Sequence, residues 1–216
     1  MPKKLIPLGK ARVMGIATGV PKAVAMLAAD VITGAGDHVI CSPTHEPELF
    51  HACLGGLGQA AIVCAARLRL VAAPARVRSF VVKHATLGAL LGDMRLLAGE
   101  GRFQHLYGNI TLLEGGRWDF ELVATEHVGD GDAGKRLLDG LSFLAGSQVE
   151  SVLPYVDFVH RVDAAAAAMK QAGLWDLPHP WLDLFVPASA AEAFIGAELG
   201  RLSHETLGQG GILIYP

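Results

Sequence analysis

The stretch from Glu48 to Arg67, ELFHACLGGLGQAAIVCAAR, decides how the first part of the chain folds. Residues 48–54 predict a short helix, the glycines after it end that helix, and the apolar run 60–70 predicts a strand covered on both faces. A glycine-rich turn lets a large ligand approach the backbone closely. The turn does not follow a strand and lacks the Gly-x-Gly-x-x-Gly spacing, so it is not a Rossmann phosphate loop.

Hydrophobic periodicity and turn residues predict the other elements. Strands are expected at residues 23–33, 38–42, 76–84, 103–114, 118–127, 181–186 and 211–215. Helices are expected at residues 87–97, 135–144, 163–172 and 189–199, the third lying between an Asp163 N-cap and Gly173. This irregular order predicts an α+β fold, an antiparallel sheet flanked by helices, divided into residues 1–72 and 73–216.

Composition excludes several classes of function. Apolar residues make up 51% of the 216 residues, charged residues make up 18%, and the net charge is -3 with scattered Lys and Arg. A nucleic-acid-binding protein needs a basic patch and a membrane helix needs about 18 apolar residues, and the sequence has neither. Residues 1–10 do not form a signal peptide either, so we expect a cytoplasmic protein.

The high apolar content predicts a large core, a deep apolar pocket, or apolar surface that a partner covers, and we expect a homodimer through such a surface. Cys41, Cys53 and Cys64 contain no Cys-x-x-Cys pair and stand among apolar neighbours. All three are therefore expected to be reduced residues of the core.

A polar stripe runs along the strand expected at 103–114. His105, Tyr107, Asn109 and Thr111 fall on one face of it, and the apolar residues between them fall on the other. One interpretation is a face that simply meets solvent. The other is that these side chains, with Trp181 and Asp183, line an apolar cavity and orient a ligand by a few hydrogen bonds.

Other motifs predict no metal site and no serine nucleophile. His45 and His51 are separated by Pro47 and by a spacing of six, so they cannot share a helical face as zinc ligands do. Asp130 and Asp132 lack the rest of a calcium loop, and no Gly-x-Ser-x-Gly motif is present.

Three stretches together resemble the cytokinin dehydrogenases, which are flavoproteins of the vanillyl-alcohol-oxidase type. They are residues 30–42 with Glu48-Leu-Phe50, residues 54–59 (LGGLGQ), and residues 173–187 (GLWDLPHPWLDLFVP). The resemblance implies that residues 73–216 form the substrate (cap) domain of a flavin-oxidase fold. Residues 1–72 would then be the residual second segment of its FAD domain.

The sequence departs from that family at the positions that carry its chemistry. Members begin with a subdomain that wraps the adenine and pyrophosphate of FAD, place a catalytic aspartate upstream, and continue past the final strand, and nothing here matches these parts. The family's acidic residue in a Phe-Asp-Tyr-Val-Glu-Gly pattern is replaced by Tyr107, and its asparagine by Asp183. We therefore expect no bound cofactor.

These departures predict an enzyme that works without flavin, cyclising or rearranging an apolar specialised metabolite such as a polyketide, for example by cycloaddition. Tyr107 would polarise or protonate a carbonyl, and His105 or Asp183 would assist proton transfer. Trp181, Asn109 and Thr111 would bind the substrate. Two alternatives stay open: an FAD-dependent oxidoreductase completed by another chain, and a ligand-binding protein without catalysis.

Overall fold

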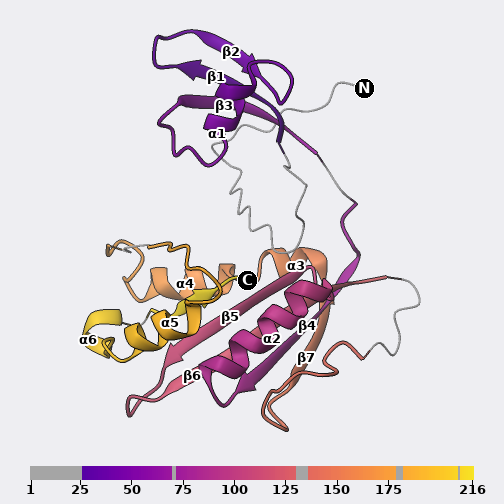
Figure 1. The fold of residues 1–216 in the computed structure, drawn as a ribbon, viewed down its shortest axis with the longest axis vertical. Helices are drawn as coiled ribbons and strands as arrows, with labels where there is room; N and C mark the ends of the chain where they lie inside the picture. The colour runs from indigo at the N-terminus through magenta and orange to yellow at the C-terminus, as the bar shows by residue number, and fades with distance from the viewer. Residues whose placement is uncertain (1–25, 70–71, 130–135, 179–181, 209) are drawn as a thin grey trace. The chain divides into compact units, whose positions relative to one another are not determined.

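The computed structural model of the chain describes residues 26–69, 72–129, 136–178, 182–208 and 210–216. The chain divides into two compact units, Met1–Ala72 and Ala73–Pro216. In Figure 1 the first unit is coloured indigo to purple and the second magenta to yellow. Among the described helices, none combines the length and the apolar composition that crossing a bilayer requires.

The first unit is a three-stranded antiparallel sheet with one helix. Its strands are β1 (Met26–Thr33), β2 (His38–Cys41) and β3 (Ala61–Leu68), in the order β2-β1-β3. Helix α1 (Pro47–Cys53) begins with proline, whose missing N–H is harmless at that position. Phe50 of α1 is fully buried in an apolar cluster with Val31 and Cys41. The expected hairpin and short helix are confirmed.

Two predictions for this unit are wrong. Strand β3 is not covered on both faces, since Ile62 is 67% exposed; β3 is an edge strand and α1 packs on one side of the sheet. The three cysteines are not all core residues either. Only Cys41 is buried, while Cys53 is half-buried and Cys64 is exposed on the outer side of β3.

The second unit contains a five-stranded antiparallel sheet in the order β7-β4-β6-β5-β8. The strands are β4 (Arg76–His84), β5 (His105–Leu112), β6 (Trp118–Val128), β7 (Val149–Pro154) and β8 (Ile212–Ile214). The turn at Gly115 and Gly116 sets the β5–β6 register, in which Leu112 pairs with Trp118 and His105 with Thr125. The α+β fold with antiparallel sheets is confirmed.

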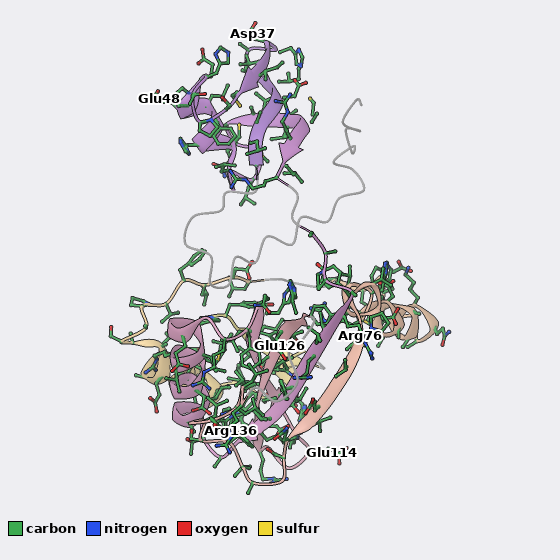
Figure 2. All side chains as sticks on the ribbon, turned by 90° about the vertical axis from the view of Figure 1, so that its right-hand side faces the viewer. Asp37, Glu48, Arg76, Glu114, Glu126 and Arg136 are labelled. Carbon is green, nitrogen blue, oxygen red and sulfur yellow. The ribbon has the colours of Figure 1, made fainter. Side chains whose placement is uncertain are left out.

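Helix α2 (Leu87–Glu100) covers one side of this sheet, which we call the helix-covered face (Figure 1). Thr86 caps the helix by accepting a hydrogen bond from the Ala89 N–H at 3.1 Å. Leu90 and Met94 of α2 pack so close to β5 that a Cβ on Gly108 would lie 3.0 Å from the Met94 sulfur. Figure 2 shows side chains filling the space between α2 and the strands.

A buried polar network joins α2 to β4 and to the segment after residue 135. The Asp93 carboxylate lies 2.8 Å from His84 Nε2, and it accepts hydrogen bonds from the Ser142 N–H at 2.8 Å and the Ser142 hydroxyl at 3.0 Å. His84 and Asp93 are both buried. Because every contact converges on one carboxylate, Asp93 holds the 136–147 segment against the sheet.

Four further helices follow: α3 (Tyr155–Val159), α4 (Asp163–Gln171), α5 (Ala191–Leu199) and α6 (His204–Leu207). Strand β7 and helix α3 were not expected. Residue Asp163 is not the N-cap of α4, since the helix is preceded by Val162 and has no side-chain cap. Gly173, in the left-handed region, does follow its end.

The helix expected at 135–144 is absent from the described part, residues 136–144. Arg102 donates hydrogen bonds to the carbonyls of Leu137 and Asp139, so these carbonyls bond to a side chain. Gly140 has a φ of 81°, which no residue of an α-helix adopts. The strand expected at 181–186 is also absent over its described residues, 182–186. Phe185 there is fully exposed, and no strand lies alongside to pair with the segment.

Candidate functional site

The second side of the five-stranded sheet, opposite α2, carries the predicted polar stripe; we call it the polar face. Along β5 the burial alternates, so that Leu106 and Ile110 are buried against the helix while His105, Tyr107, Asn109 and Thr111 are half-buried on the polar face. The predicted division of β5 into two faces is confirmed. The polar side chains are neither freely solvated nor deeply buried.

One end of the polar face is an aromatic cluster around two imidazoles. The His105 ring lies 5.8 Å from that of His127 and 5.0 Å from that of Phe158 on α3. The Tyr155 ring meets His127 edge-on at 5.7 Å. Arg161 lies over Phe158, with its guanidinium carbon 4.3 Å from the ring centre. Helix α3 therefore encloses the imidazoles on a face that is otherwise partly open.

Burial keeps these two imidazoles neutral near pH 7. It lowers the pKa of His105, which the neighbouring His127 and Arg161 lower further, and it also lowers the pKa of His127. Within the described residues, both Nε2 atoms are buried and have no hydrogen-bond partner. Buried polar atoms are nearly always paired, so a ligand or ordered water that reached them would gain two directed contacts.

The middle of the polar face holds two tyrosines. Tyr107 from β5 and Tyr215, just after β8, have ring centres 6.2 Å apart. Burial raises the pKa of the Tyr215 phenol, Tyr107 and Asp183 add to the rise, and Arg161 opposes it. Asp183 is thus close enough to act on Tyr215. The structure brings three of the predicted residues, Tyr107, His105 and Asp183, into one region.

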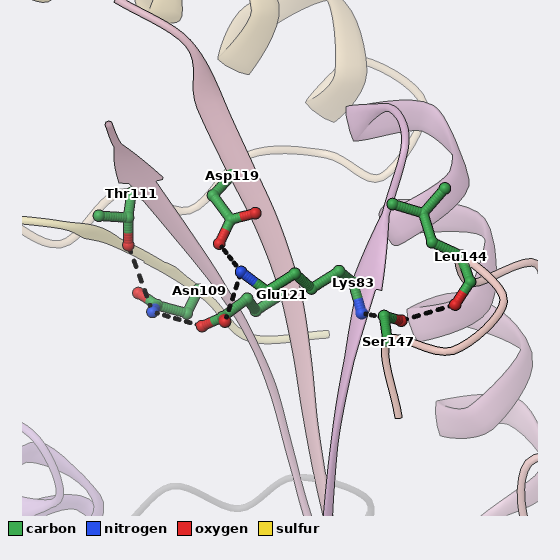
Figure 3. Close-up of polar contacts among 7 residues, drawn as sticks. All are labelled: Lys83, Asn109, Thr111, Asp119, Glu121, Leu144 and Ser147. Carbon is green, nitrogen blue, oxygen red and sulfur yellow. Dashed lines mark hydrogen bonds and ion pairs between the residues drawn. The ribbon is translucent and has the colours of Figure 1, made fainter. Parts of the chain in front are cut away.

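The other end is an ion-pair network, drawn in Figure 3. Lys83 Nζ donates to Asp119 at 2.6 Å and lies 3.5 Å from Glu121, and hydrogen bonding to Asp119 is the largest cause of the raised pKa of Lys83. The Asn109 amide donates to Glu121 at 3.3 Å and to the Thr111 hydroxyl at 3.4 Å. Asn109 and Thr111, predicted to bind substrate, are therefore engaged with their neighbours.

The glycine turn of the first unit, residues 54–59, is exposed. Gly55 and Gly58 have φ angles of 70° and 78°, and a Cβ added to either would meet nothing within 4 Å. Gly56 differs, because its Cβ would lie 2.1 Å from the Ala52 carbonyl oxygen. Leu57 between them is 93% exposed and adopts the left-handed conformation that non-glycine residues avoid.

This turn could make one contact with an anionic cofactor such as FAD, through its backbone amides. Within the described residues, the amides of Leu57 and Gly58 have no acceptor, and unpaired backbone amides are groups that phosphate or carbonyl oxygens bind. Two amides alone do not hold a pyrophosphate, so the turn supplies part of such a site. The described residues contain no cluster of three or more side chains suited to a metal ion.

A separate cavity of about 350 Å³ opens beside the β4–β7 edge, away from the stripe. Arg78, Phe80, Leu137 and Glu150 are among its lining residues. Arg78 there already pairs with Glu126 at 3.1 Å and with Glu150 at 3.2 Å. None of the five predicted site residues that the structure describes lines this cavity.

Sequence reasoning missed His127, Phe158, Arg161 and Tyr215. The first could have been found, since the glycine turn fixes the hairpin register and puts His127 next to His105 on the same face. Phe158 comes from α3, Arg161 from the link just after α3, and Tyr215 from the segment after β8, and no local signal places these segments beside β5. Trp181, predicted as an apolar wall, lies outside the described residues.

The chain is similar in sequence to one protein family and to several known proteins. The family model "Cytokinin dehydrogenase 1, FAD and cytokinin binding" matches residues 122–216. Cytokinin dehydrogenase 5 of Oryza sativa subsp. japonica is 36% identical over 222 residues, covering 87% of this chain and 41% of the relative. An uncharacterized oxidoreductase, ORF5 in the fasciation locus of Rhodococcoides fascians, is 32% identical over 191 residues, with coverages of 86% and 43%.

A solved structure shares the fold: 6-hydroxy-D-nicotine oxidase from Arthrobacter nicotinovorans has a TM-score of 0.51 at 20% identity, with coverage of 84% of this chain and 41% of that one. This chain spans less than half the length of the curated relatives named above. The fold resembles the substrate-binding half of flavin oxidases of the vanillyl-alcohol-oxidase type. The chain is therefore a partial relative of the cytokinin dehydrogenases and other FAD-linked oxidases, and residues 122–216 correspond to the family's FAD- and cytokinin-binding region.

Proposed function

We propose that this chain provides the substrate-binding half of an FAD-dependent oxidoreductase that acts on a small planar amine of the cytokinin kind. The observation that carries the proposal is the polar face, where two half-buried imidazoles, each with a buried Nε2 that has no partner within the described residues, share the face with two tyrosines. Aromatic walls with a few fixed polar atoms suit a flat heterocycle that carries ring nitrogens. The named relatives favour this alternative over a flavin-free cyclase.

Each residue of the face has a role in this proposal. The neutral His105 and His127 would exchange hydrogen bonds with ring nitrogens, because a neutral imidazole nitrogen either donates or accepts. Tyr107, which stands where relatives carry an acidic residue, would donate its hydroxyl to the substrate. Phe158 would stack against the heterocycle.

FAD, when bound, supplies the two-electron acceptor for oxidation of the substrate. The residues of this chain that would contact it are those of the exposed glycine turn, through the amides of Leu57 and Gly58. A tyrosine hydroxyl in place of the acidic residue can donate a hydrogen bond, which a carboxylate cannot. We therefore expect substrates whose reacting nitrogen is already neutral to be favoured.

A titration with isopentenyladenine, a cytokinin, tests the proposal. Calorimetry of the purified chain should show binding, and Tyr107→Phe should weaken it about 3- to 10-fold, the effect of losing one hydrogen bond. Glu114→Gln, at the exposed β5–β6 turn labelled in Figure 2, is the matched control and should bind like the wild type.

Turnover is measured separately with added FAD and an artificial electron acceptor. Reduction of the acceptor that depends on both FAD and isopentenyladenine supports the oxidoreductase. Binding without such reduction would favour the non-catalytic alternative. Absence of binding in every variant, or equal weakening by Glu114→Gln, would contradict the assignment of the polar face.

A further inference from the structure

Two cysteines of the first unit lie together in its apolar cluster. Cys41 is the last residue of β2, and Cys53 is the last residue of α1. Phe50, three residues before Cys53, is fully buried in the cluster that contains Cys41, and Cys53 packs against that same cluster. Since residues three apart share a helix face, α1 presents Phe50 and Cys53 to the same cluster.

The two thiols differ in access. Cys41 is completely buried, and burial, followed by the proximity of the Cys53 thiol, raises its pKa. Cys53 is half-buried and so can be reached from solvent. Each residue ends its element, where small backbone adjustments are tolerated, which helps a pair reach the Cα separation of about 4.4–6.8 Å that a disulfide needs.

We propose that Cys41 and Cys53 form a peroxide-sensitive dithiol that closes reversibly into a disulfide. In the first step the Cys53 thiolate attacks hydrogen peroxide, so that an S–O bond forms, the O–O bond breaks and hydroxide leaves with the thiol's proton as water. In the second step the Cys41 sulfur attacks the Cys53 sulfenic acid, an S–S bond forms, and water leaves. The sum is two thiols and one peroxide giving one disulfide and two waters.

The division of roles follows from burial. The accessible thiol meets the oxidant, while the buried thiol of raised pKa is a poor first nucleophile and acts as the resolving partner. Leu54, directly after Cys53, begins the glycine turn. The disulfide would fasten the entry to that turn to the end of β2. This inference is independent of the proposed function, because it needs only the fold of the first unit.

Treatment of the whole chain with hydrogen peroxide, followed by mass spectrometry, tests the inference. We expect a product about 2 Da lighter, the loss of two hydrogens, whose non-reducing peptide map links Cys41 to Cys53 and which dithiothreitol reverses. Cys64→Ser, at the exposed cysteine, is the matched control and should give the same product. Cys53→Ser should abolish it.

If Cys53→Ser also perturbs packing, its loss of the disulfide is ambiguous, so a second variant is needed. In Cys41→Ala the Cys53 sulfenic acid has no resolving partner, so dimedone should trap it at least tenfold more than in the wild type. A peptide map that links Cys64, or only chains to one another, would overturn the proposal. Persistence of free Cys41 and Cys53 in the wild type while Cys64 is oxidised would overturn it as well.

Discussion

The two faces of the five-stranded sheet use the same strands for opposite purposes. On the helix-covered face, alternate residues of β5 and β6 such as Ile110 and Leu122 are completely buried against α2. The buried Asp93 carboxylate on this side is fully paired, although His84 beside it keeps a buried Nδ1 without a partner within the described residues. On the polar face, the alternate residues of β5 are half-buried although Thr125 of β6 is buried, and both His105 and His127 keep a buried Nε2 without a partner within the described residues.

This difference separates stability from binding. A residue on the helix-covered face contributes apolar burial, which is the dominant favourable term in folding. A buried polar atom left without a partner costs stability, and that cost is recovered when a ligand or water pairs with it. Substitutions at adjacent positions of one strand should therefore have very different effects.

Ile110→Ala should have the largest effect. The side chain is fully buried against α2, and its loss should destabilise the second unit by about 2–5 kcal/mol through lost burial and a residual cavity. Thr111→Ala, one residue along on the polar face, is the matched control and should cost less than about 1 kcal/mol. Hydrogen exchange of β5 and β6 amides measures both; similar losses would break the distinction between the faces.

Asp93→Asn should come next, at about 1–3 kcal/mol. The amide oxygen can still accept from His84 and from the Ser142 N–H, but these bonds lose the carboxylate charge that strengthens them. The amide NH2 group faces the Ser142 hydroxyl, which must turn from donor to acceptor. Protection in the 136–147 segment should fall before that of β5. Asp139→Asn, in the same segment but exposed, should leave exchange unchanged.

Acidification should lower the free energy of unfolding through two residues of the polar face, His105 and His127. The pKa values of His105 and His127 are lowered in the folded state, so below the ordinary value of 6.5 the unfolded chain takes up protons that the folded chain does not. Stability is thus fully present above pH 6.5 and is lost as the pH falls.

The measurement compares urea midpoints at about pH 7.5 and about pH 5.5, on either side of the ordinary imidazole pKa. In the double variant His105→Gln/His127→Gln the drop should be smaller than in the wild type. The control His204→Gln, at an exposed position, should retain the whole drop. A drop unaffected by the double variant would refute the buried-imidazole explanation.

Lys83→Ala should have the smallest effect, no more than about 1 kcal/mol. The ammonium group is partly solvated, so its ion pairs with Asp119 and Glu121 are screened by water and salt. Unfolding at low and at high salt should show the small difference shrinking as salt increases. A loss comparable with that of Ile110→Ala would mean that the ion-pair end of the polar face is as important to folding as the core.

Local signals predicted much of the fold. The β1–β2 hairpin, α1, β4, α2 and the β5–β6 hairpin follow from alternation, helical spacing and glycine turns, each of which acts over a few neighbouring residues. Predictions failed where distant partners decide the outcome. Arg102 binds two carbonyls of the 136–144 segment and prevents a helix there, and β7 pairs with β4 although its own residues show no clear alternation.

The two faces of β5 follow from residue order alone, because side chains alternate along any extended strand. This alternation predicted one stripe of polar residues, His105, Tyr107, Asn109 and Thr111. The neighbours of each side chain depend on how distant segments fold against β5. Helix α3 and the β6 strand enclose the imidazoles, Tyr215 and Asp183 join Tyr107, and Glu121 engages Asn109. The physical reason is that periodicity is a local property of the backbone, whereas burial, pKa and pairing depend on groups that are distant in the chain.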